Sequence, residues 1–300
     1  MLKSLSNFCI KATRVLFPDI EPLRNDIDHL KFQTGSNILV QKEIFLRYQL
    51  LKNSFQPKLS FSDIGFSVFS QTDEDGILLY IFSLIGTTSK RCVELAYGSP
   101  YMSNTTNLIC NWKWDGLLLE GDQKLIDLSL KFFSSYCKVK SDLPLLVHCW
   151  ATKENINSLL KKNRFSGVVD LLSIDLNGND YWLWQGITEI SPRVVVIEYR
   201  SEWLANYALT IPYDSNFNRD NFDGHYYGAS LGAFVKLGRK KGYRLIGCNR
   251  NEFNAFFMKN GVGEKYFKEL SVNDCLKKSS AMTDLKIRLK QMKKYRWIKV

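Results

Sequence analysis

The chain has 300 residues, of which 45% are hydrophobic and 13% aromatic, so it can bury the core of one large domain and is not a disordered segment. Seven cysteines are present without a C-x-x-C pair, and most have apolar neighbours. This pattern favours reduced, buried thiols in a cytoplasmic protein over a disulfide framework or a zinc site. No stretch approaches the ~20 consecutive apolar residues of a membrane-spanning helix.

The formal net charge of +11 is concentrated near the end of the sequence. Residues 261–300 contain eleven Lys or Arg against four Asp or Glu, and we expect them to form a basic helical tail. Such a tail is typical of a solvated surface and, less often, of a segment that binds an anionic partner. Membrane lipid, lipopolysaccharide and nucleic acid are the partners that this charge would attract.

Two helices are predicted before the main domain. Residues 1–17 repeat apolar side chains at helical spacing, with three basic residues between them, until Pro18 ends the pattern. This amphipathic helix would dock on the domain or lie at a membrane surface, and its basic residues interrupt any secretory signal. With a second helix over residues 37–53, residues 1–60 form a helical N-terminal extension.

Residues 61–260 have the alternation of an α/β domain. Ser70 and Thr72 each precede an acid by three residues, which is the spacing of a capping box and predicts a helix start. Beyond residue 91, buried strands alternate with helical patterns, which predicts a largely parallel sheet with helices on both faces. Two closing strands form a hairpin and hence an antiparallel edge. The strands are predicted over residues 92–96, 116–120, 145–150, 168–174, 193–198, 243–248 and 254–259.

Carboxylates stand at the ends of two neighbouring strands, where ligands bind in open α/β sheets. Asp175 follows an apolar run and opens the polar stretch DLNGND, and Glu198 ends the next strand. Two such carboxylates can share Mg²⁺, which takes oxygen ligands, so Asp175 and Glu198 are a candidate metal pair. The D-x-N-x-N spacing is not a calcium loop, because Asp180 stands where that loop needs glycine.

Two further strand ends contain candidate cofactor-binding residues. Glu94 opens the turn ELAYGSP, which resembles the E-x-G-x-G-x-G turn of class I S-adenosylmethionine-dependent methyltransferases, with only Gly98 retained among the glycines. Glu120 ends the second strand, where a carboxylate can accept hydrogen bonds from both ribose hydroxyls of a nucleoside cofactor. Asp122 follows it as a helix N-cap or a further cofactor contact.

Several segments in order resemble the FkbM-like branch of class I methyltransferases over about residues 65–260. They are SQTDEDGIL, VELAYG, SNTTNL, GLLLEGD, DLLSIDLNGNDYWLW, PRVVVIEY, YYGASLGAFVKLGRKKGYRLIGCN and NAFF. The resemblance implies a seven-stranded Rossmann-like sheet, mostly parallel with an antiparallel edge. It places S-adenosylmethionine over the first two strands and an acceptor, often a sugar hydroxyl, over the fourth and fifth. This bacterial type is often encoded with polysaccharide biosynthesis genes.

The resemblance therefore implies O-methylation of a glycan or glycolipid precursor, with Asp175 or His225 as the base. Imidazole titrates near neutrality, and the loop that contains His225 would lie over the strand ends. The amphipathic helix and the basic tail are consistent with a cytoplasmic enzyme that works peripherally at the inner membrane face on a lipid-linked sugar. A small-molecule sugar acceptor is the simpler alternative.

Four positions depart from the family pattern. Ala96 and Pro100 replace glycines, Asn177 replaces an acid, and Arg200 replaces an asparagine. A cation near the candidate metal pair weakens divalent binding by charge repulsion. Arg200 would instead pair with one of these carboxylates, or clamp an anionic acceptor such as a phosphate or a sugar acid.

Two other functions stay open. The replaced positions are consistent with a catalytically retired methyltransferase fold that serves as a binding or scaffold protein. The positive charge alone motivates an RNA methyltransferase, but there is neither an RRM-like aromatic signature nor an N-P-P-Y motif. Nucleic acid is therefore the least favoured partner.

Overall fold

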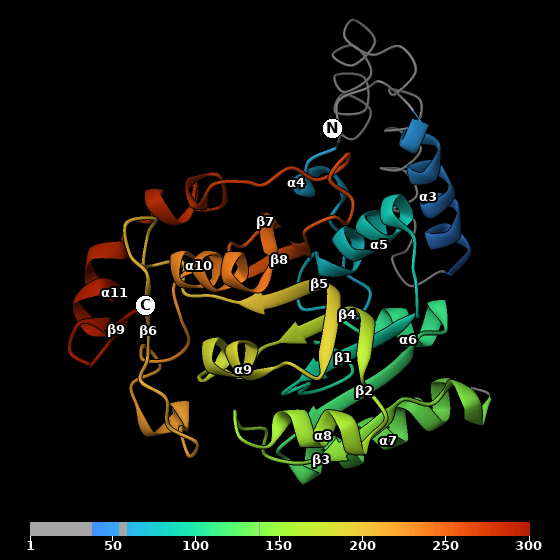
Figure 1. Cartoon of the computed structure of the whole chain (residues 1–300), viewed down its shortest axis with the longest axis horizontal. Coiled ribbons are helices and arrows are strands. Elements are labelled where there is room, and N and C mark those ends of the chain that lie inside the picture. Colours follow the sequence, from blue (N-terminus) through green and yellow to red (C-terminus); the bar gives the residue numbers. More distant parts are fainter. Residues whose placement is uncertain (1–37, 54–58, 138) are drawn as a thin grey trace, which may run out of the picture.

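One seven-stranded sheet organises the chain, with the strand order β3-β2-β1-β4-β5-β8-β7 (Figure 1). The computed structural model describes residues 38–53, 59–137 and 139–300, so the helix predicted over residues 1–17 lies outside the described part. Strands β1 to β5 are parallel, and β8 runs antiparallel between β5 and β7. This arrangement confirms the predicted Rossmann-like methyltransferase sheet. The strands are β1 (Arg91–Leu95), β2 (Asp115–Glu120), β3 (Leu145–His148), β4 (Gly167–Ile174), β5 (Ile190–Glu198), β7 (Tyr243–Cys248) and β8 (Asn254–Lys259).

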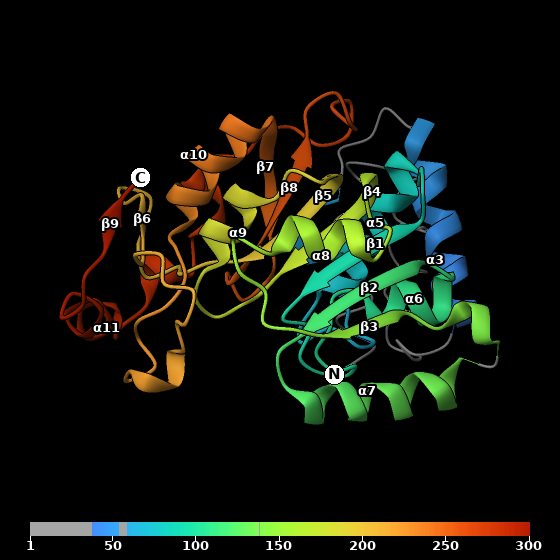
Figure 2. The ribbon, with the colours of Figure 1, turned by 60° about the horizontal axis from the view of Figure 1, so that its bottom comes forward.

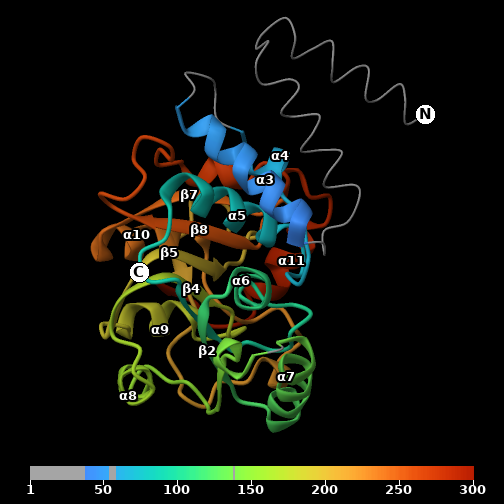
Figure 3. The same ribbon diagram turned by 90° about the vertical axis from the view of Figure 1, so that its right-hand side faces the viewer.

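Helices cover both faces of the sheet and bury it (Figure 3). On one face, α8, α9 and α10 contribute Leu160, Trp184 and Phe234 to the core. On the other, α3 and α5 contribute Tyr48 and Leu78. None of the helices in the described ranges is long and apolar enough to cross a membrane. The helices are α3 (Ile38–Leu50), α4 (Phe61–Ile64), α5 (Glu74–Ile85), α6 (Thr106–Trp112), α7 (Gln123–Tyr136), α8 (Ile156–Lys162), α9 (Asp180–Gly186), α10 (Leu231–Lys241) and α11 (Leu285–Met292).

The register of the parallel strands brings the predicted site residues to one edge. Leu95 of β1 pairs with Leu119 of β2 and with Ile174 of β4, and Ile174 pairs with Ile197 of β5. The residue that follows each of these positions therefore lies at the carboxyl edge of the sheet. Continuous burial of the second half of β4 explains its apolar sequence, because both faces of this strand are covered.

The start of α5 differs in detail from the predicted capping box. The helix begins at Glu74, as expected, but the reciprocal bonds join Ser70 and Asp75, five residues apart. Asp75 N donates to Ser70 Oγ at 3.1 Å, and Ser70 N donates to Asp75 Oδ2 at 2.8 Å. Asp75 Oδ2 also accepts the N–H groups of Val68 and Phe69, both at 2.7 Å. The spacing therefore predicted the helix start correctly, but the bonds differ because the preceding turn folds back over the helix and converges on one carboxylate.

The basic tail, residues 261–300, packs on the domain (Figure 2). Glu252 holds its middle part by accepting the N–H groups of Lys278 and Ser279, both at 2.7 Å. Helix α11 follows, and β9 (Ile298–Lys299) then pairs antiparallel with β6 (Leu209–Thr210). The sequence pattern did not predict this second, two-stranded sheet.

Candidate active site

The turn after β1 has two residues in the left-handed region, although Ala96 and Pro100 stand where the resemblance predicts glycines. Ala96 has a φ of 51° and Gly98 a φ of 68°, both in the left-handed region. Glycine enters this region freely, whereas an alanine there is strained by its Cβ. Ala96 therefore adopts the backbone conformation that a glycine would adopt more easily.

Glu120 fixes this turn and retains capacity for a ligand. Its Oε2 accepts the N–H of Gly98 at 2.7 Å, and its Oε1 accepts the N–H of Asp122 at 2.8 Å. A carboxylate offers two lone pairs on each oxygen, so each oxygen can accept one further hydrogen bond. Two hydroxyls on adjacent ribose carbons would fit these positions. Asp122 itself is exposed and caps α7 by accepting Lys124 N at 2.7 Å.

Glu94 lies beneath the turn, where its carboxylate is occupied by protein groups. It accepts Ser103 Oγ at 2.6 Å, Asn104 N at 2.9 Å, Thr105 Oγ1 at 2.6 Å and Ser173 Oγ at 3.1 Å. Burial raises the pKa of Glu94, and these hydrogen bonds oppose that shift. Glu94 therefore connects the start of α6 with β1 and β4, and these contacts help to fix the turn after β1.

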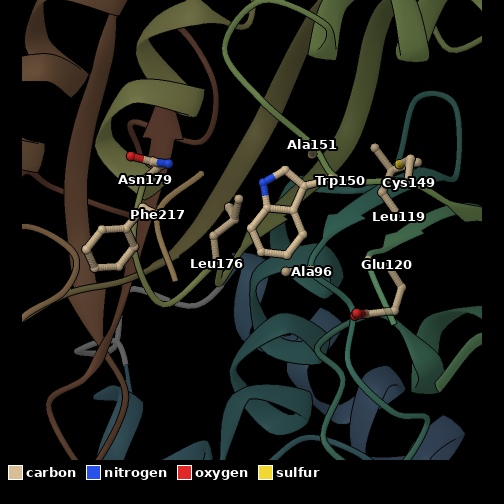
Figure 4. Close-up of a pocket in the computed structure, with 11 residues that line it drawn as sticks. Ala96, Leu119, Glu120, Cys149, Trp150, Ala151, Leu176, Asn179 and Phe217 are labelled. Atoms are coloured by element: carbon tan, nitrogen blue, oxygen red, sulfur yellow. The ribbon is translucent and has the colours of Figure 1, made fainter. Parts of the chain in front are cut away.

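A hollow of about 500 Å³, including its open mouth, lies beside Glu120. Figure 4 shows the Trp150 ring near its centre, between Glu120 on one side and Phe217 on the other. A Cβ on Gly121 would lie 2.9 Å from the Trp150 ring, and one on Gly178 would lie 2.5 Å from the Phe217 ring. These two glycines therefore let the aromatic rings lie against the backbone. The hollow is lined by Ala96, Leu119, Glu120, Gly121, Cys149, Trp150, Ala151, Leu176, Gly178, Asn179 and Phe217.

Residues 211–228, which we name the cover loop, border this hollow. Trp150 Nε1 donates to Ser215 O at 2.9 Å, and Asn179 Nδ2 donates to Asp214 O at 2.6 Å. These bonds tie the loop to the ends of β3 and β4. Side chains of the loop add to these contacts, because Tyr213 binds Glu154 and Arg219 binds Asn177.

The C-terminal residues support the same loop from outside. The rings of Tyr226 and Tyr295 stack with centroids 4.7 Å apart, and Tyr226 Oη donates to Arg296 O at 2.7 Å. The Trp297 ring packs against those of Tyr226 and Trp203, with centroid distances of 5.4 and 5.1 Å. The aromatic layer therefore links the basic tail to the cleft.

Asp175 and Glu198 lie together, as the sequence predicts. Burial raises the pKa of Asp175 to about 7, and the charge of nearby Asp180 adds to the shift. Burial and then Asp175 hold the pKa of Glu198 well above its ordinary value. The hydrogen bond between the two carboxyl groups lowers the pKa of Asp175 and raises that of Glu198, so Glu198 is the group of this pair that holds a proton more tightly. The buried Oδ1 of Asp175 has no amide, hydroxyl or guanidinium donor in the described part of the chain.

The donor set of this pair does not fit a divalent cation. The pair shares a proton, and the positive charge of Arg219 is close enough to lower the pKa of Asp175. Within residues 38–53, 59–137 and 139–300, no three His, Cys, Asp or Glu side chains are grouped as metal ligands. Mg²⁺ prefers several anionic or neutral oxygens in an octahedral set. The predicted metal role of Asp175 and Glu198 is therefore not supported by the geometry.

The structure shows the contacts of Arg200 and His225, for which the sequence allowed more than one role. Arg200 pairs with Glu202 at 2.9 Å, and not with either carboxyl group of the pair. The side chain of Asp223 accepts the N–H of His225 at 3.1 Å, while the imidazole makes no hydrogen bond or ion pair within the described ranges. Of the two predicted bases, only Asp175 is held in place by other side chains of the cleft.

The strand order decides the fold assignment. The chain has the class I methyltransferase fold. No protein-family model and no curated protein matches the sequence, so the FkbM-like branch stays a prediction.

Similar solved structures have the same general architecture. An O-methyltransferase from Bacillus cereus in complex with S-adenosylhomocysteine is 14% identical, with a TM-score of 0.41, and the match covers 73% of this chain and 98% of that one. An S-adenosylmethionine-dependent methyltransferase from Clostridium acetobutylicum is 13% identical, with a TM-score of 0.39 and coverage of 61% and 89%. The N-terminal domain of EvdMO1 with S-adenosylhomocysteine bound is 14% identical, with a TM-score of 0.40 and coverage of 72% and 94%. These likenesses are too weak to assign a residue role to this methyltransferase fold.

Four residues of the cleft were not predicted. Trp150 ends a predicted strand, so the rule that ligands lie at strand ends would have indicated it. Phe217, Arg219 and Tyr227 belong to the cover loop, whose polar sequence has no periodic pattern. Their position depends on contacts with Gly178 and with other distant segments, which no local signal specifies.

Proposed function

We propose that the chain is an S-adenosylmethionine-dependent O-methyltransferase that methylates a hydroxyl of a glycan or glycolipid precursor. The observation that carries the proposal is Asp175: a carboxyl group at the carboxyl edge of the sheet, next to Leu176 of the hollow, with a pKa raised to about 7. Such a group can accept a proton near neutral pH. The hollow beside Glu120, with its two remaining acceptor positions, supports nucleoside binding in the same cleft.

S-adenosylmethionine supplies an electrophilic methyl group when it is bound. Glu120 would hold the two ribose hydroxyls, and the left-handed turn at Ala96 and Gly98 would let the backbone approach the cofactor. The Trp150 ring offers an apolar face to the adenine. These residues orient the cofactor and contribute no covalent chemistry.

Asp175 would remove the proton of the acceptor hydroxyl as its oxygen forms the new bond to carbon. The bond between that carbon and the sulfonium sulfur breaks, and its electron pair remains on the neutral thioether. Glu198 would orient Asp175 through the hydrogen bond between the two carboxyl groups. General base catalysis of this kind contributes roughly 10²- to 10⁴-fold to the rate. Alignment of the acceptor by the walls of the cleft supplies the rest.

The membrane contact is a separate part of the proposal. Helix α11 has an exposed Ile287 (64%) between the exposed Lys286 and Lys290, which supports contact with an anionic surface. A lipid-linked sugar would then reach the cleft from the inner membrane face. Binding to vesicles with and without anionic lipid tests this contact: equal binding to both would contradict it.

Calorimetry with S-adenosylhomocysteine tests the cofactor site. We expect binding to wild type and a loss of about 10- to 100-fold in Glu120→Gln, because charged hydrogen bonds to the ribose are removed. Asp122→Asn is the matched control, since it changes an exposed cap, and it should bind within about twofold of wild type. Thermal unfolding of each variant checks that the fold is retained. No binding of either cofactor form by wild type would overturn the proposal and favour a retired methyltransferase fold.

A further inference from the structure

Two guanidinium groups lie over one aromatic ring on the β5 side of the cleft. The Cζ atom of Arg200 is 4.0 Å from the centre of the Tyr227 ring, and that of Arg219 is 5.3 Å from it. Arg200 follows β5, whereas Arg219 belongs to the cover loop. Both guanidinium groups contact the same ring, and two like charges in one cluster repel each other.

The protein neutralises these charges only in part. Glu202 contacts Arg200 at 2.9 Å, whereas Arg288, which lies 3.7 Å from Glu202, is paired more closely with Asp284 at 2.8 Å. Arg219 donates to the neutral amide oxygen of Asn177 and forms no ion pair in the part of the chain that the structure describes. Against Glu202 alone, the two guanidinium groups that contact the Tyr227 ring carry one excess positive charge.

Arg200 also has an unused donor. The residue is only 7% exposed, and its Nε has no hydrogen-bond partner within the described ranges. A buried donor without a partner is costly and calls for an explanation, of which a missing ligand is one. An oxyanion on the acceptor would supply the partner.

The cluster of Arg200, Arg219 and Tyr227 lies near Asp175, the proposed base. Asn177, which binds Arg219, lies two residues beyond Asp175 and directly before Gly178 of the hollow. Asp180 fixes this turn by accepting Leu176 N at 2.6 Å and Gly178 N at 2.9 Å. The cluster therefore lies on the acceptor side, across the cleft from the strand that ends at Glu120.

We infer that Arg200 and Arg219 bind an oxyanion of the acceptor, so that the substrate is a sugar phosphate or a sugar acid and not a neutral sugar. The planar, forked donors of arginine suit both phosphate and carboxylate. This inference rests on the proposed function, because it names the acceptor class of the same cleft.

Calorimetry with full-length protein tests the inference, using glucose, glucose 1-phosphate, glucuronate and inorganic phosphate as probes, with and without S-adenosylhomocysteine. We expect at least one anionic probe to bind at least 10-fold more tightly than glucose, and its affinity to fall as salt is added. Preference for the phosphate probes identifies a sugar phosphate, and preference for glucuronate a sugar acid. Glucose that binds as tightly as both anionic sugars would overturn the inference.

Variants separate this site from the cofactor site. Arg219→Gln removes one guanidinium group from the partly exposed cover loop and should weaken the anionic probe about 10-fold or more, while Arg219→Lys restores part of the affinity. Arg239→Gln is the matched control, since Arg239 pairs with Glu269 on an exposed helix surface. Unchanged anion affinity in Arg219→Gln would overturn the inference. Anion binding without any S-adenosylhomocysteine binding would instead sink the proposed function and leave the anion site standing.

Discussion

Two aspartates five residues apart, one inside β4 and one just beyond its end, show how position determines the use of a buried carboxyl group. Asp170 lies inside the strand and is fully buried, whereas Asp175 lies just beyond its carboxyl end. Asp170 accepts the N–H groups of residues 88–90 and pairs with Arg193 at 2.7 Å. Burial alone would raise the pKa of Asp170, but Arg193 and these N–H groups outweigh it and lower the pKa.

Asp175 has the opposite environment. Its nearest partners are acidic, its Oδ1 has no donor in the described residues, and its pKa is raised to about 7. The aspartate inside β4 therefore stabilises the fold, whereas the aspartate just beyond the end of the strand stays reactive. A carboxylate whose oxygens accept hydrogen bonds from N–H and guanidinium groups has a lowered pKa and stabilises the fold. A carboxylate at the carboxyl edge of the sheet that lacks these donors has a raised pKa and can act as a base.

The largest expected effect comes from Asp175→Asn, which keeps the shape and removes the base. We expect S-adenosylhomocysteine production with an anionic sugar acceptor to fall by roughly 10²- to 10⁴-fold, with thermal stability equal to or above that of wild type. His225→Gln is the control and should stay within about threefold of wild type. A small loss of activity in Asp175→Asn together with a large loss in His225→Gln would show that His225, and not Asp175, is the base.

Asp170→Asn should act on stability instead. It removes the partner of Arg193, whose side chain is only 11% exposed, and leaves its charge uncompensated, at a cost of ~3–5 kcal/mol in the free energy of unfolding. Urea denaturation measures this loss. Glu269→Gln, which breaks an exposed ion pair, should cost less than ~1 kcal/mol. Equal effects of the two substitutions would contradict the contrast between the ends of β4.

The pH dependence should follow Asp175 and not Asp170. A base must be ionised, so kcat/KM should rise about tenfold per pH unit below pH 7 and level off above it. The raised pKa means that the folded state binds this proton more tightly than the unfolded state. The stability that it contributes is therefore present below the ordinary pKa of 3.8 and is lost as the pH rises toward about 7. A rate that is flat from pH 5 to 8 would exclude Asp175 as the base.

A smaller effect is expected in the aromatic layer. Trp297→Ala should loosen the cover loop through Tyr226 and raise KM for the acceptor by about 3- to 10-fold, because the loop positions Arg219. The affinity for S-adenosylhomocysteine should change less, since Glu120 and the turn after β1 lie outside the loop. Hydrogen exchange over residues 211–228 measures the loosening directly. Unchanged exchange would show that the tail does not support the loop.

The smallest effect should come from Ala96→Gly. The substitution removes the backbone strain of an alanine with positive φ, which costs about 1–2 kcal/mol. Part of this gain is offset because glycine is more flexible in the unfolded chain, so the free energy of unfolding should rise by ~0.5–1 kcal/mol. Thermal unfolding measures the gain. Gly86→Ala, at another left-handed position, should move stability in the opposite direction.

The sequence predicted the sheet, its antiparallel edge and the meeting of Asp175 with Glu198, because these follow from apolar periodicity and from parallel strand ends. It also predicted that Glu120 ends a strand, which is a local signal, whereas the cofactor role of Glu120 stays a prediction. The proton shared by the carboxyl pair could not be predicted, since it depends on burial and on the distance between two strands.

The cover loop and the tail escaped prediction for a related reason. The cluster of Arg200, Arg219 and Tyr227 joins segments that no periodicity connects. The stacking of Tyr226 on Tyr295 spans about 70 residues of sequence. Only tertiary packing determines such contacts.

An infrared titration of carboxyl groups tests the central contrast most directly. Difference spectra of wild type minus Asp175→Asn and wild type minus Asp170→Asn isolate each group as the pH is varied from 3 to 9. We predict that the protonated carboxyl band of Asp175 disappears near pH 7, whereas Asp170 stays ionised down to below pH 4. Titration of Asp175 below pH 5 would contradict its role as a base in this cleft.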